Sequence, residues 1–173
     1  MDTASLLKRA RSGDKDALVA LIMAKKDEYY RLAYTYTGNR EDALDCLQDM
    51  TVKVFDNIRK LRNADAFYSW SKTILVNLCR ALLRKKGRVI VLDHIVEEAC
   101  HEDYSAREER QDILDCLNRL SSIHQEVIKL RYFMDMDYET IARVSGIPVG
   151  TVKSRISGGM TRLRELFGGD YRG

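Results

Sequence analysis

The stretch DYETIARVSGIPVGTVKSRISGGMTRLREL, residues 137–166, is typical of two short helices joined by a tight turn. A helix-turn-helix needs a small residue where its helices cross, and Ala142 can serve there. Four residues later, Gly146 can adopt the positive φ that such a turn requires. Pro148 suits the first turn of a helix because its missing N–H would have no intrahelical partner there. The stretch therefore predicts a helix over residues 138–144, a turn, and a second helix from residue 148 onward.

The second helix of this motif has two different faces. Its expected buried face consists of apolar residues at helical spacing: Val152, Ile156, Met160 and Leu163. Its candidate DNA contacts lie on or near the opposite face: Thr151, Lys153, Ser154, Arg155 and Ser157. Short polar side chains and helix-end amides reach phosphates, while Lys and Arg reach phosphates or guanine edges, so this face fits a DNA major groove. Two ordinary packed helices are the alternative interpretation.

Gly158 and Gly159 lie near the middle of this helix, where each glycine costs roughly 1 kcal/mol relative to alanine. Gly158 falls on the outer face, and Gly159 is expected where the helix packs closely on its neighbour. We interpret the pair as permitting close approach or a bend along the groove, with base readout concentrated in the first turns, up to Ser154 or Arg155. Neutral drift is the alternative.

The composition of the chain is typical of an all-helical globular protein. Its 173 residues are 45% hydrophobic and 32% charged, with one proline and ten glycines, whereas an all-β protein needs many turns. The length allows one ordinary domain or two small ones. No apolar run approaches the ~20 residues of a membrane span, and the first residues lack the apolar core of a signal peptide. We therefore expect a cytoplasmic protein without direct membrane insertion.

Charge is distributed unevenly along the chain, although the net charge is only +3. Residues 71–88 contain six bases and no acid, and residues 148–173 contain five bases and two acids. Between these blocks, residues 93–115 contain nine acids and two bases. Two basic blocks separated by an acidic one indicate two polyanion-binding modules and a linker that does not bind. A solvated charged surface is the alternative.

Helical periodicity predicts three helices in the first half of the chain: residues 16–37, 40–61 and 67–86, with a loop at 62–65. The second of these helices is expected to bury one stripe of residues: Leu44, Leu47, Thr51, Val54, Phe55 and Ile58.

Two further helices are predicted before the helix-turn-helix, over residues 105–120 and 124–134. Ser105 to Glu108 fits the spacing of a capping box, and Ser121 or Ser122 can cap the next helix. Residues 88–104 form the expected linker, in which Val89 to Leu92 fits either a short strand or a linker segment.

The four cysteines, Cys46, Cys79, Cys100 and Cys116, form no CxxC pair. Buried thiols are the expectation in a reducing cytosol. Cys100 and His101 are alternatively a fragment of a metal site, but their spacing fits no common zinc pattern. No residue cluster suggests catalysis, so we predict no metal, no cofactor and no enzyme activity.

Four segments together resemble the extracytoplasmic-function (ECF) sigma factors, the compact branch of the sigma-70 family. The stretch quoted first closely resembles their region four, and NRLSSIHQEVIKLRYFMDMDYETIA, residues 118–142, resembles its start. GNREDALDCLQDMTVKVF, residues 38–55, resembles the region-two helix that grips RNA polymerase. FYSWSKTILVNLCRALLRKKGR, residues 67–88, resembles the helix associated with the minus-ten promoter element. The resemblance covers nearly the whole chain in the right order.

This resemblance implies an all-α fold of two small helical domains. Region two would span residues 1–87, region four residues 105–173, and a flexible acidic linker residues 88–104. The protein would bind core RNA polymerase, direct it to promoter DNA and help melt the minus-ten element. The family also implies an anti-sigma factor, often membrane-anchored, that covers these binding faces, and no small-molecule substrate.

The resemblance also implies site residues. The implied contacts to core polymerase are Asp42, Asp45, Gln48 and Asp49, for which a solvated acidic helix face is the alternative. The implied minus-ten contacts are Arg62, Asn63, Trp70, Asn77, Arg80, Arg84 and Lys85. The loop at residues 60–67 would capture an unpaired base, which needs a pocket of polar and stacking groups. Trp70 is alternatively a core residue. The minus-thirty-five element would be contacted by Lys153, Ser154 and Arg155, with Thr151 and Ser157 beside them.

The sequence departs from the family pattern at three places. Ala81 stands where an aspartate is usual, Ser71 stands where a large apolar residue is usual, and residues 157–159 replace an aromatic or histidine followed by arginine and alanine. Two other functions stay open on the residues alone. A stand-alone helix-turn-helix regulator would bind palindromic DNA as a dimer, whereas a protein adaptor would have no salt-dependent affinity for nucleic acid.

Overall fold

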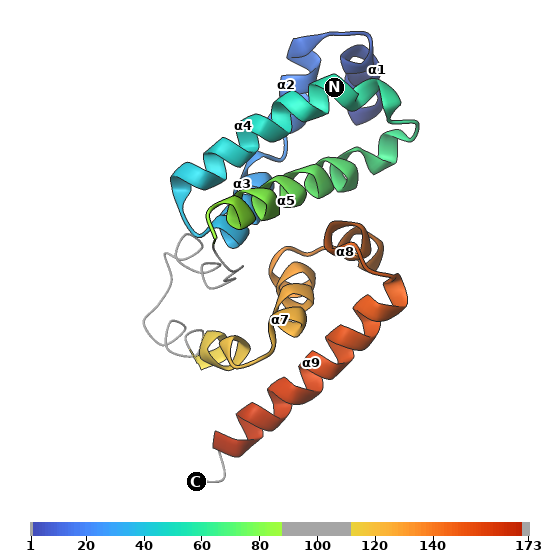
Figure 1. The fold of residues 1–173 in the computed structure, drawn as a ribbon. Coiled ribbons are helices and arrows are strands. Elements are labelled where there is room, and N and C mark those ends of the chain that lie inside the picture. Colours follow the sequence, from blue (N-terminus) through green and yellow to red (C-terminus); the bar gives the residue numbers. More distant parts are fainter. Residues whose placement is uncertain (1, 88–111, 171–173) are drawn as a thin grey trace, which may run out of the picture. The chain divides into compact units, whose positions relative to one another are not determined.

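The structure is a computed structural model that describes residues 2–87 and 112–170. Every regular element in these residues is a helix (Figure 1), which confirms the predicted all-α class. The chain divides into two compact units, Met1–Val91 and Leu92–Gly173. Several predicted features lie outside the described residues: the linker at 88–104, the segment Val89–Leu92, the capping box at Ser105–Glu108, and Cys100 with His101.

The first unit contains five α-helices and two short 3₁₀-helices within its described residues. These elements are α1 (Thr3–Arg11), α2 (Lys15–Met23), α3 (Lys26–Thr37), α4 (Arg40–Asn57), η1 (Ile58–Lys60), η2 (Ala64–Ala66) and α5 (Phe67–Lys85). Helices α3, α4 and α5 pack on one another, and α1 packs on α2. Figure 1 shows α4 and α5 running side by side. Their shared core includes Tyr29, Tyr36, Met50, Val54 and Leu75.

The single helix predicted over residues 16–37 is wrong, because α2 ends at Met23 and α3 begins at Lys26. Lys25, between them, has φ −126° and ψ 23°, which is not helical backbone. The apolar stripe is interrupted at this place, since no residue from Met23 to Glu28 is buried. The break lets the two helices bury their stripes in different directions.

Helix α1 was not predicted from the sequence. Its buried residues are only Leu7 and Ala10, three positions apart, and its last turn carries three bases. So short a stripe is a weak periodic signal. Packing against α2 stabilises α1, as is usual for helices of this length.

The buried stripe predicted for residues 40–61 is confirmed at only two of its six positions, Val54 and Ile58. Leu44 is 41% exposed and Phe55 38% exposed, and Leu47 and Thr51 are half-buried. The residues that α4 and η1 bury instead are Ala43, Cys46, Met50, Val54 and Ile58. Small side chains at the start of the stripe allow close packing on the neighbouring helices, and the larger Leu44 stays outside. The size and hydropathy of the side chains therefore did not identify the buried face of α4.

The second unit contains helical residues 112–118, α7 (Ser122–Ile128), a π-helical turn η3 (Lys129–Phe133), α8 (Tyr138–Ser145) and α9 (Val149–Asp170). The helix predicted over residues 124–134 thus begins two residues earlier and changes to a π-helix at Lys129. Ser121 is the N-cap residue, but its hydroxyl lies 3.2 Å from Nδ1 of His124 and caps no backbone amide. One apolar cluster holds this unit together: Leu114, Cys116, Leu117, Leu120, Ile128 and Leu166, with Met160, Leu163 and Phe167 against it.

Candidate nucleic-acid and polymerase interfaces

The predicted helix-turn-helix is confirmed in α8 and α9. Gly146 ends α8 with φ 69° and ψ 33°, the left-handed conformation that glycine adopts without strain. The amide of Ile147 donates to the carbonyl of Ala142 at 3.1 Å, which closes the turn. Pro148 precedes the first residue of α9, and its carbonyl accepts from the amides of Thr151 and Val152. The second helix therefore begins one residue later than predicted.

Asp137 positions the first helix of this motif. Its carboxylate accepts a hydrogen bond from the amide of Thr140 at 2.6 Å, which caps the N-terminus of α8. The same hydrogen bond is the main reason that the pKa of Asp137 lies below its ordinary value. The cap therefore fixes where α8 begins.

The two faces of α9 lie as predicted. Val152 and Ile156 are buried, whereas Lys153, Ser154 and Ser157 are exposed. Thr151 and Arg155 are half-buried at the edge of the exposed face. All five candidate minus-thirty-five contacts thus lie on or beside one surface of α9. Whether they touch DNA stays a prediction.

A basic cluster beside this surface was missed by the sequence reasoning. The ammonium of Lys153 lies 5.7 Å from the ring centroid of Tyr138, and the guanidinium of Arg131 lies 5.1 Å from the same centroid. A cation over an aromatic face is attracted by the ring quadrupole. Tyr138 therefore gathers two bases from different helical segments. The three residues lie in three different helical segments, η3, α8 and α9, so the periodicity of a single helix could not reveal the cluster.

Gly159 lies where α9 crosses α7. A Cβ added to Gly159 would lie 2.6 Å from Cδ1 of Ile128 and 3.2 Å from Cβ of His124. Such distances are too short for van der Waals contact, which confirms the predicted close packing at Gly159. Gly158 is exposed, and its added Cβ would lie 3.4 Å from Nε2 of His124, which is an ordinary contact.

Helix α5 presents one polar face along its length. Asn77, Arg84 and Lys85 are exposed, and Arg80 is half-buried with its guanidinium 5.7 Å from the ring centroid of Tyr36. Positions seven apart in a helix share a face, so Trp70, Asn77 and Arg84 lie in one row. Trp70 is half-buried, with its ring centroid 6.3 Å from that of Phe67. The structure thus aligns all five predicted minus-ten residues of α5 from Trp70 to Lys85 on or near this face.

The loop before α5 carries the other two minus-ten candidates, Arg62 and Asn63, which are both exposed. The carboxamide oxygen of Asn63 accepts from the amide of Asp65 at 3.0 Å and starts the short helix η2. Asn63 therefore has a structural role whether or not it touches DNA.

Ser71, which stands where the family usually has a large apolar residue, forms two buried hydrogen bonds. Its hydroxyl lies 2.6 Å from the hydroxyl of Tyr29 and 2.8 Å from the carbonyl oxygen of Phe67. Tyr29 is fully buried, and this burial raises its pKa. A large apolar residue at position 71 would leave the Tyr29 hydroxyl without this partner.

The predicted polymerase contacts on α4 separate into two groups. Asp45, Gln48 and Asp49 are exposed. Asp42 is buried, and its carboxylate accepts from Nζ of Lys86 at 2.5 Å and from Nδ2 of Asn39 at 2.7 Å. The structure therefore argues against Asp42 as a surface contact, because its charge is used to join the start of α4 to the end of α5.

Apolar side chains lie among the exposed acids of α4. Leu44 is 41%, Val52 60% and Phe55 38% exposed, while Asp45, Gln48 and Asp49 lie between them in the sequence. We call these six residues the α4 outer face. Sequence reasoning assigned Leu44 and Phe55 to the core and so missed the apolar part of this face. Exposed apolar groups bordered by charges are typical of a surface that binds another protein.

The cysteines of the described residues behave as expected. Cys46, Cys79 and Cys116 are buried free thiols. Cys46 and Cys79 are hydrogen-bonded to one another across α4 and α5, which lowers the pKa of Cys46 and raises that of Cys79. In residues 2–87 and 112–168, no group of three or more His, Cys, Asp or Glu side chains is arranged to hold a metal ion. Nor does any helix of these segments combine the length and apolarity needed to cross a membrane.

Comparisons with known proteins agree with this geometry. The sequence matches the family profile of sigma-70 region 2 over residues 21–89 and that of sigma-70 region 4 over residues 110–163. The RNA polymerase sigma factor SigV of Bacillus subtilis (strain 168) is 31% identical over 150 residues, covering 87% of this chain and 90% of SigV.

Two solved structures are similar to this one. The structure of CnrH in complex with the cytosolic domain of CnrY has a TM-score of 0.69 and 24% identity, covering 98% of this chain and 99% of that chain; this likeness concerns the fold. The sigma factor RpoE from Bartonella quintana, in complex with the anti-sigma factor NepR, has a TM-score of 0.62 and 27% identity, covering 84% of this chain and 93% of that chain. With both family regions matched in order on two helical units, the chain belongs to the extracytoplasmic-function sigma factors of the sigma-70 family.

Proposed function

We propose that this sigma factor binds core RNA polymerase through the α4 outer face. The support is that Leu44, Val52 and Phe55 are exposed beside the acids Asp45 and Asp49, since apolar anchors bordered by charges are typical of protein interfaces. The acids Asp45 and Asp49 would set the orientation and speed of docking, and the apolar side chains most of the affinity. Asp42 stays outside this interface because it is buried.

The polar face of α5 is the proposed surface for the minus-ten element. Arg80, Arg84 and Lys85 would neutralise phosphates, and Asn77 can hydrogen-bond a base edge. Arg62 and Asn63 would border the pocket for an unpaired base, with Trp70 supporting the loop from the side of α5. Half-burial of Trp70 favours this supporting role over a direct contact.

The outer face of α9 is the proposed surface for the minus-thirty-five element. Thr151 and Ser154 lie in the first turns, where short side chains approach phosphates, and Lys153 and Arg155 can reach base edges. The bases held by Tyr138 would extend this surface toward α8. Region two is assigned to residues 1–87 and region four to residues 105–173, joined by residues 88–104.

Regulation by an anti-sigma factor is part of the same proposal. RpoE was solved with the anti-sigma factor NepR, and this chain has exposed apolar side chains on α4 that a protein partner could cover. A membrane-anchored anti-sigma factor would hold this cytoplasmic protein at the membrane, away from polymerase, until a signal releases it. The proposed role is transcription initiation, with no catalytic chemistry and no small-molecule substrate.

The proposal rests on one observation: Leu44, Val52 and Phe55 are exposed on α4, on the same face as the exposed Asp45, Gln48 and Asp49. A binding experiment tests it. Fluorescently labelled protein should bind purified core polymerase, and Leu44→Ala with Phe55→Ala should weaken this binding at least tenfold. Loss of binding with retained helicity supports the assignment.

Two results would contradict the proposal. A protein that binds palindromic duplexes tightly without polymerase is a conventional regulator. A protein that binds polymerase but shows no salt-dependent affinity for DNA, alone or in the complex, is an adaptor.

A further inference from the structure

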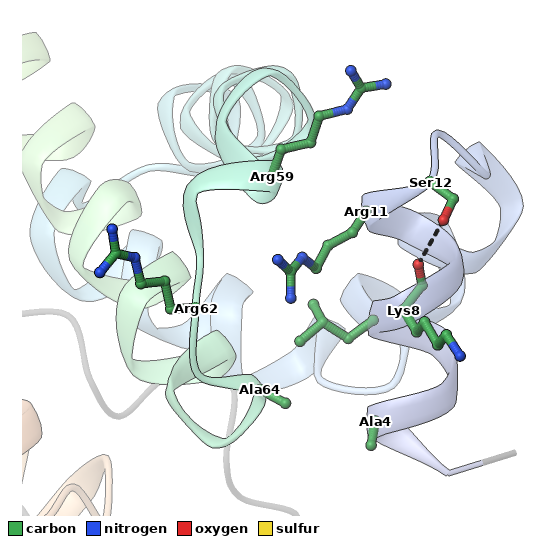
Figure 2. Close-up of a pocket in the computed structure, with 8 residues that line it drawn as sticks. Ala4, Lys8, Arg11, Ser12, Arg59, Arg62 and Ala64 are labelled. Atoms are coloured by element: carbon green, nitrogen blue, oxygen red, sulfur yellow. Dashed lines mark hydrogen bonds between the residues drawn. The ribbon is translucent and has the colours of Figure 1, made fainter.

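A surface hollow of about 590 Å³ lies between α1 and the segment of residues 59–64 (Figure 2). Every charged residue that lines it is basic, and one of them, Arg62, already belongs to the proposed minus-ten loop. The hollow therefore adjoins a surface already described. A pair of cysteines in the core of the same unit has no part in the proposed contacts to polymerase or DNA.

Cys46 of α4 and Cys79 of α5 face one another where these two helices pack. Their side chains are hydrogen-bonded, which places the two sulfur atoms in contact. The positions one turn away on each helix lie on the same face. These positions are buried and apolar: Ala43, Met50, Val76 and Leu83. The thiol pair therefore lies inside the contact between α4 and α5.

This arrangement suits a disulfide. Two cysteines can be joined without movement of the backbone only when their side chains point toward one another, and the hydrogen bond between these thiols meets that condition. Cys46 and Cys79 are also the only cysteines among residues 1–91, the first unit. Within this unit each thiol therefore has a single candidate partner.

The two thiols differ in reactivity. Their hydrogen bond is the main reason that the pKa of Cys46 is lowered and that of Cys79 is raised, while burial and the acids of α4 oppose the shift at Cys46. The thiolate is the nucleophilic form of cysteine. Cys46 is also nearer to solvent, with 3% of its surface exposed against 0% for Cys79. Cys46 is therefore the better nucleophile, and Cys79 is placed to react with it afterwards.

We propose that Cys46 and Cys79 are a redox modification site, at which a peroxide joins α4 to α5 through a reversible disulfide. In a reducing compartment disulfides are rare, and those that form are usually transient, either catalytic or redox-sensing. The bond would connect the helix that carries the α4 outer face with the helix that carries the proposed minus-ten face. The site goes beyond the proposed function, because its chemistry needs neither polymerase nor DNA.

Hydrogen peroxide is the proposed oxidant, since only a small molecule can reach thiols that are so deeply buried. The Cys46 sulfur attacks one peroxide oxygen, the O–O bond breaks, and a sulfenic acid and one water are formed. The Cys79 sulfur then attacks the Cys46 sulfur, the S–S bond forms, the S–O bond breaks and a second water leaves. The two thiols lose two electrons and two protons, and the peroxide takes up both. A thiol reductant reverses the reaction by thiol–disulfide exchange.

Peptide mapping of the intact, reduced chain tests the proposal. The chain is treated with hydrogen peroxide, remaining thiols are alkylated in denaturant, and the digest is analysed by mass spectrometry. We expect a peptide pair joined through Cys46 and Cys79, which dithiothreitol separates again. Cys116, a buried free thiol of the second unit, is the internal control. It has no thiol partner among the described residues, so it should be oxidised about tenfold more slowly.

Two single variants test the roles of the thiols. Cys79→Ser keeps a donor beside Cys46 but cannot form a disulfide, so the sulfenic acid of Cys46 should accumulate and react with dimedone. Cys46→Ser should leave Cys79 unlabelled, because Cys79 is completely buried. Far-ultraviolet circular dichroism establishes that each variant is folded. Dimedone labelling of Cys79 but not of Cys46 would overturn the assignment of Cys46 as the nucleophile.

The Tm of the first unit gives an independent measurement. A disulfide restricts the unfolded chain between residues 46 and 79, so oxidation should raise this Tm by at least about 5 °C. A disulfide that lowers the Tm would show that the native thiols are not placed for it, and the proposal would be overturned. It is also overturned if peroxide yields no Cys46–Cys79 peptide, or if either cysteine pairs instead with Cys100, Cys116 or another copy of the chain.

Discussion

Gly159 of α9 faces Ile128 of α7 so closely that an added Cβ would lie 2.6 Å from Cδ1 of the isoleucine. Ile128 is 2% exposed and belongs to the core of the second unit, so its side chain has little room to move. The glycine therefore sets the distance between the recognition helix and the helix that supports it. This benefit offsets the helix propensity lost at this position.

Replacing the two adjacent glycines by alanine should have opposite effects on stability. Gly159→Ala should lower the free energy of unfolding by about 1–3 kcal/mol, because the extra methyl overpacks the contact between α9 and α7. Gly158→Ala should raise it by up to about 1 kcal/mol, because its Cβ meets only an ordinary contact and alanine favours the helix. Urea denaturation of the full chain checks both values, and an increase for both alanines would contradict the packing argument.

The sequence predicted the environment of Gly159 but not that of α4, and the difference has a physical cause. In α9, the turn glycine Gly146 and the residues before it indicate where the helix begins. The residues of α9 that face inward can therefore be predicted. In α4, two overlapping apolar stripes share Val54 and Ile58. Packing against α3 and α5 selects the stripe that begins at Ala43, which no local signal reveals. Helix α1 was missed for a related reason. Its own sequence has only a short apolar stripe, and packing against α2 stabilises it.

Ser71→Ala should destabilise the first unit by about 1–3 kcal/mol, because it leaves the buried hydroxyl of Tyr29 without its hydrogen-bond partner. Tyr29→Phe should lower the free energy of unfolding by less than Ser71→Ala does, since the Ser71 hydroxyl still donates to the carbonyl of Phe67. The double variant Tyr29→Phe with Ser71→Ala should be more stable than Ser71→Ala alone. Thermal denaturation measures the three differences, and a neutral Ser71→Ala would show that the hydroxyl pair contributes nothing.

Asp42 and Asp49 should behave differently although both are acids of α4. Asp42→Ala should lower the free energy of unfolding by about 1–3 kcal/mol, since it removes a buried acceptor from Lys86 and Asn39. Asp49→Ala should leave stability within about 0.5 kcal/mol and slow association with core polymerase. Stopped-flow binding together with denaturation separates the two effects. The reverse pattern would return Asp42 to the polymerase interface.

The cap of α8 predicts a pH dependence. The folded-state pKa of Asp137 is lowered, so its stabilising contribution is present above the unfolded pKa of roughly 4 and is lost as pH falls through the lower folded value. Asp137→Ala should lower the free energy of unfolding by about 1 kcal/mol at pH 7, and this loss should be smaller at pH 3. Asp137→Asn keeps a capping oxygen and should lose less at pH 7. A pH-independent cost for Asp137→Ala would contradict the role of the ionised carboxylate.

Run-off transcription measures whether the chain directs core polymerase to promoters. Purified core polymerase transcribes sheared DNA from the protein's own source, with and without the chain, and transcript ends are mapped. We predict start sites that depend on the chain and share two short upstream elements, one bound by α5 and its loop and the other by α9. Transcription that does not change when the chain is added, while the chain alone shifts palindromic duplexes, would contradict it.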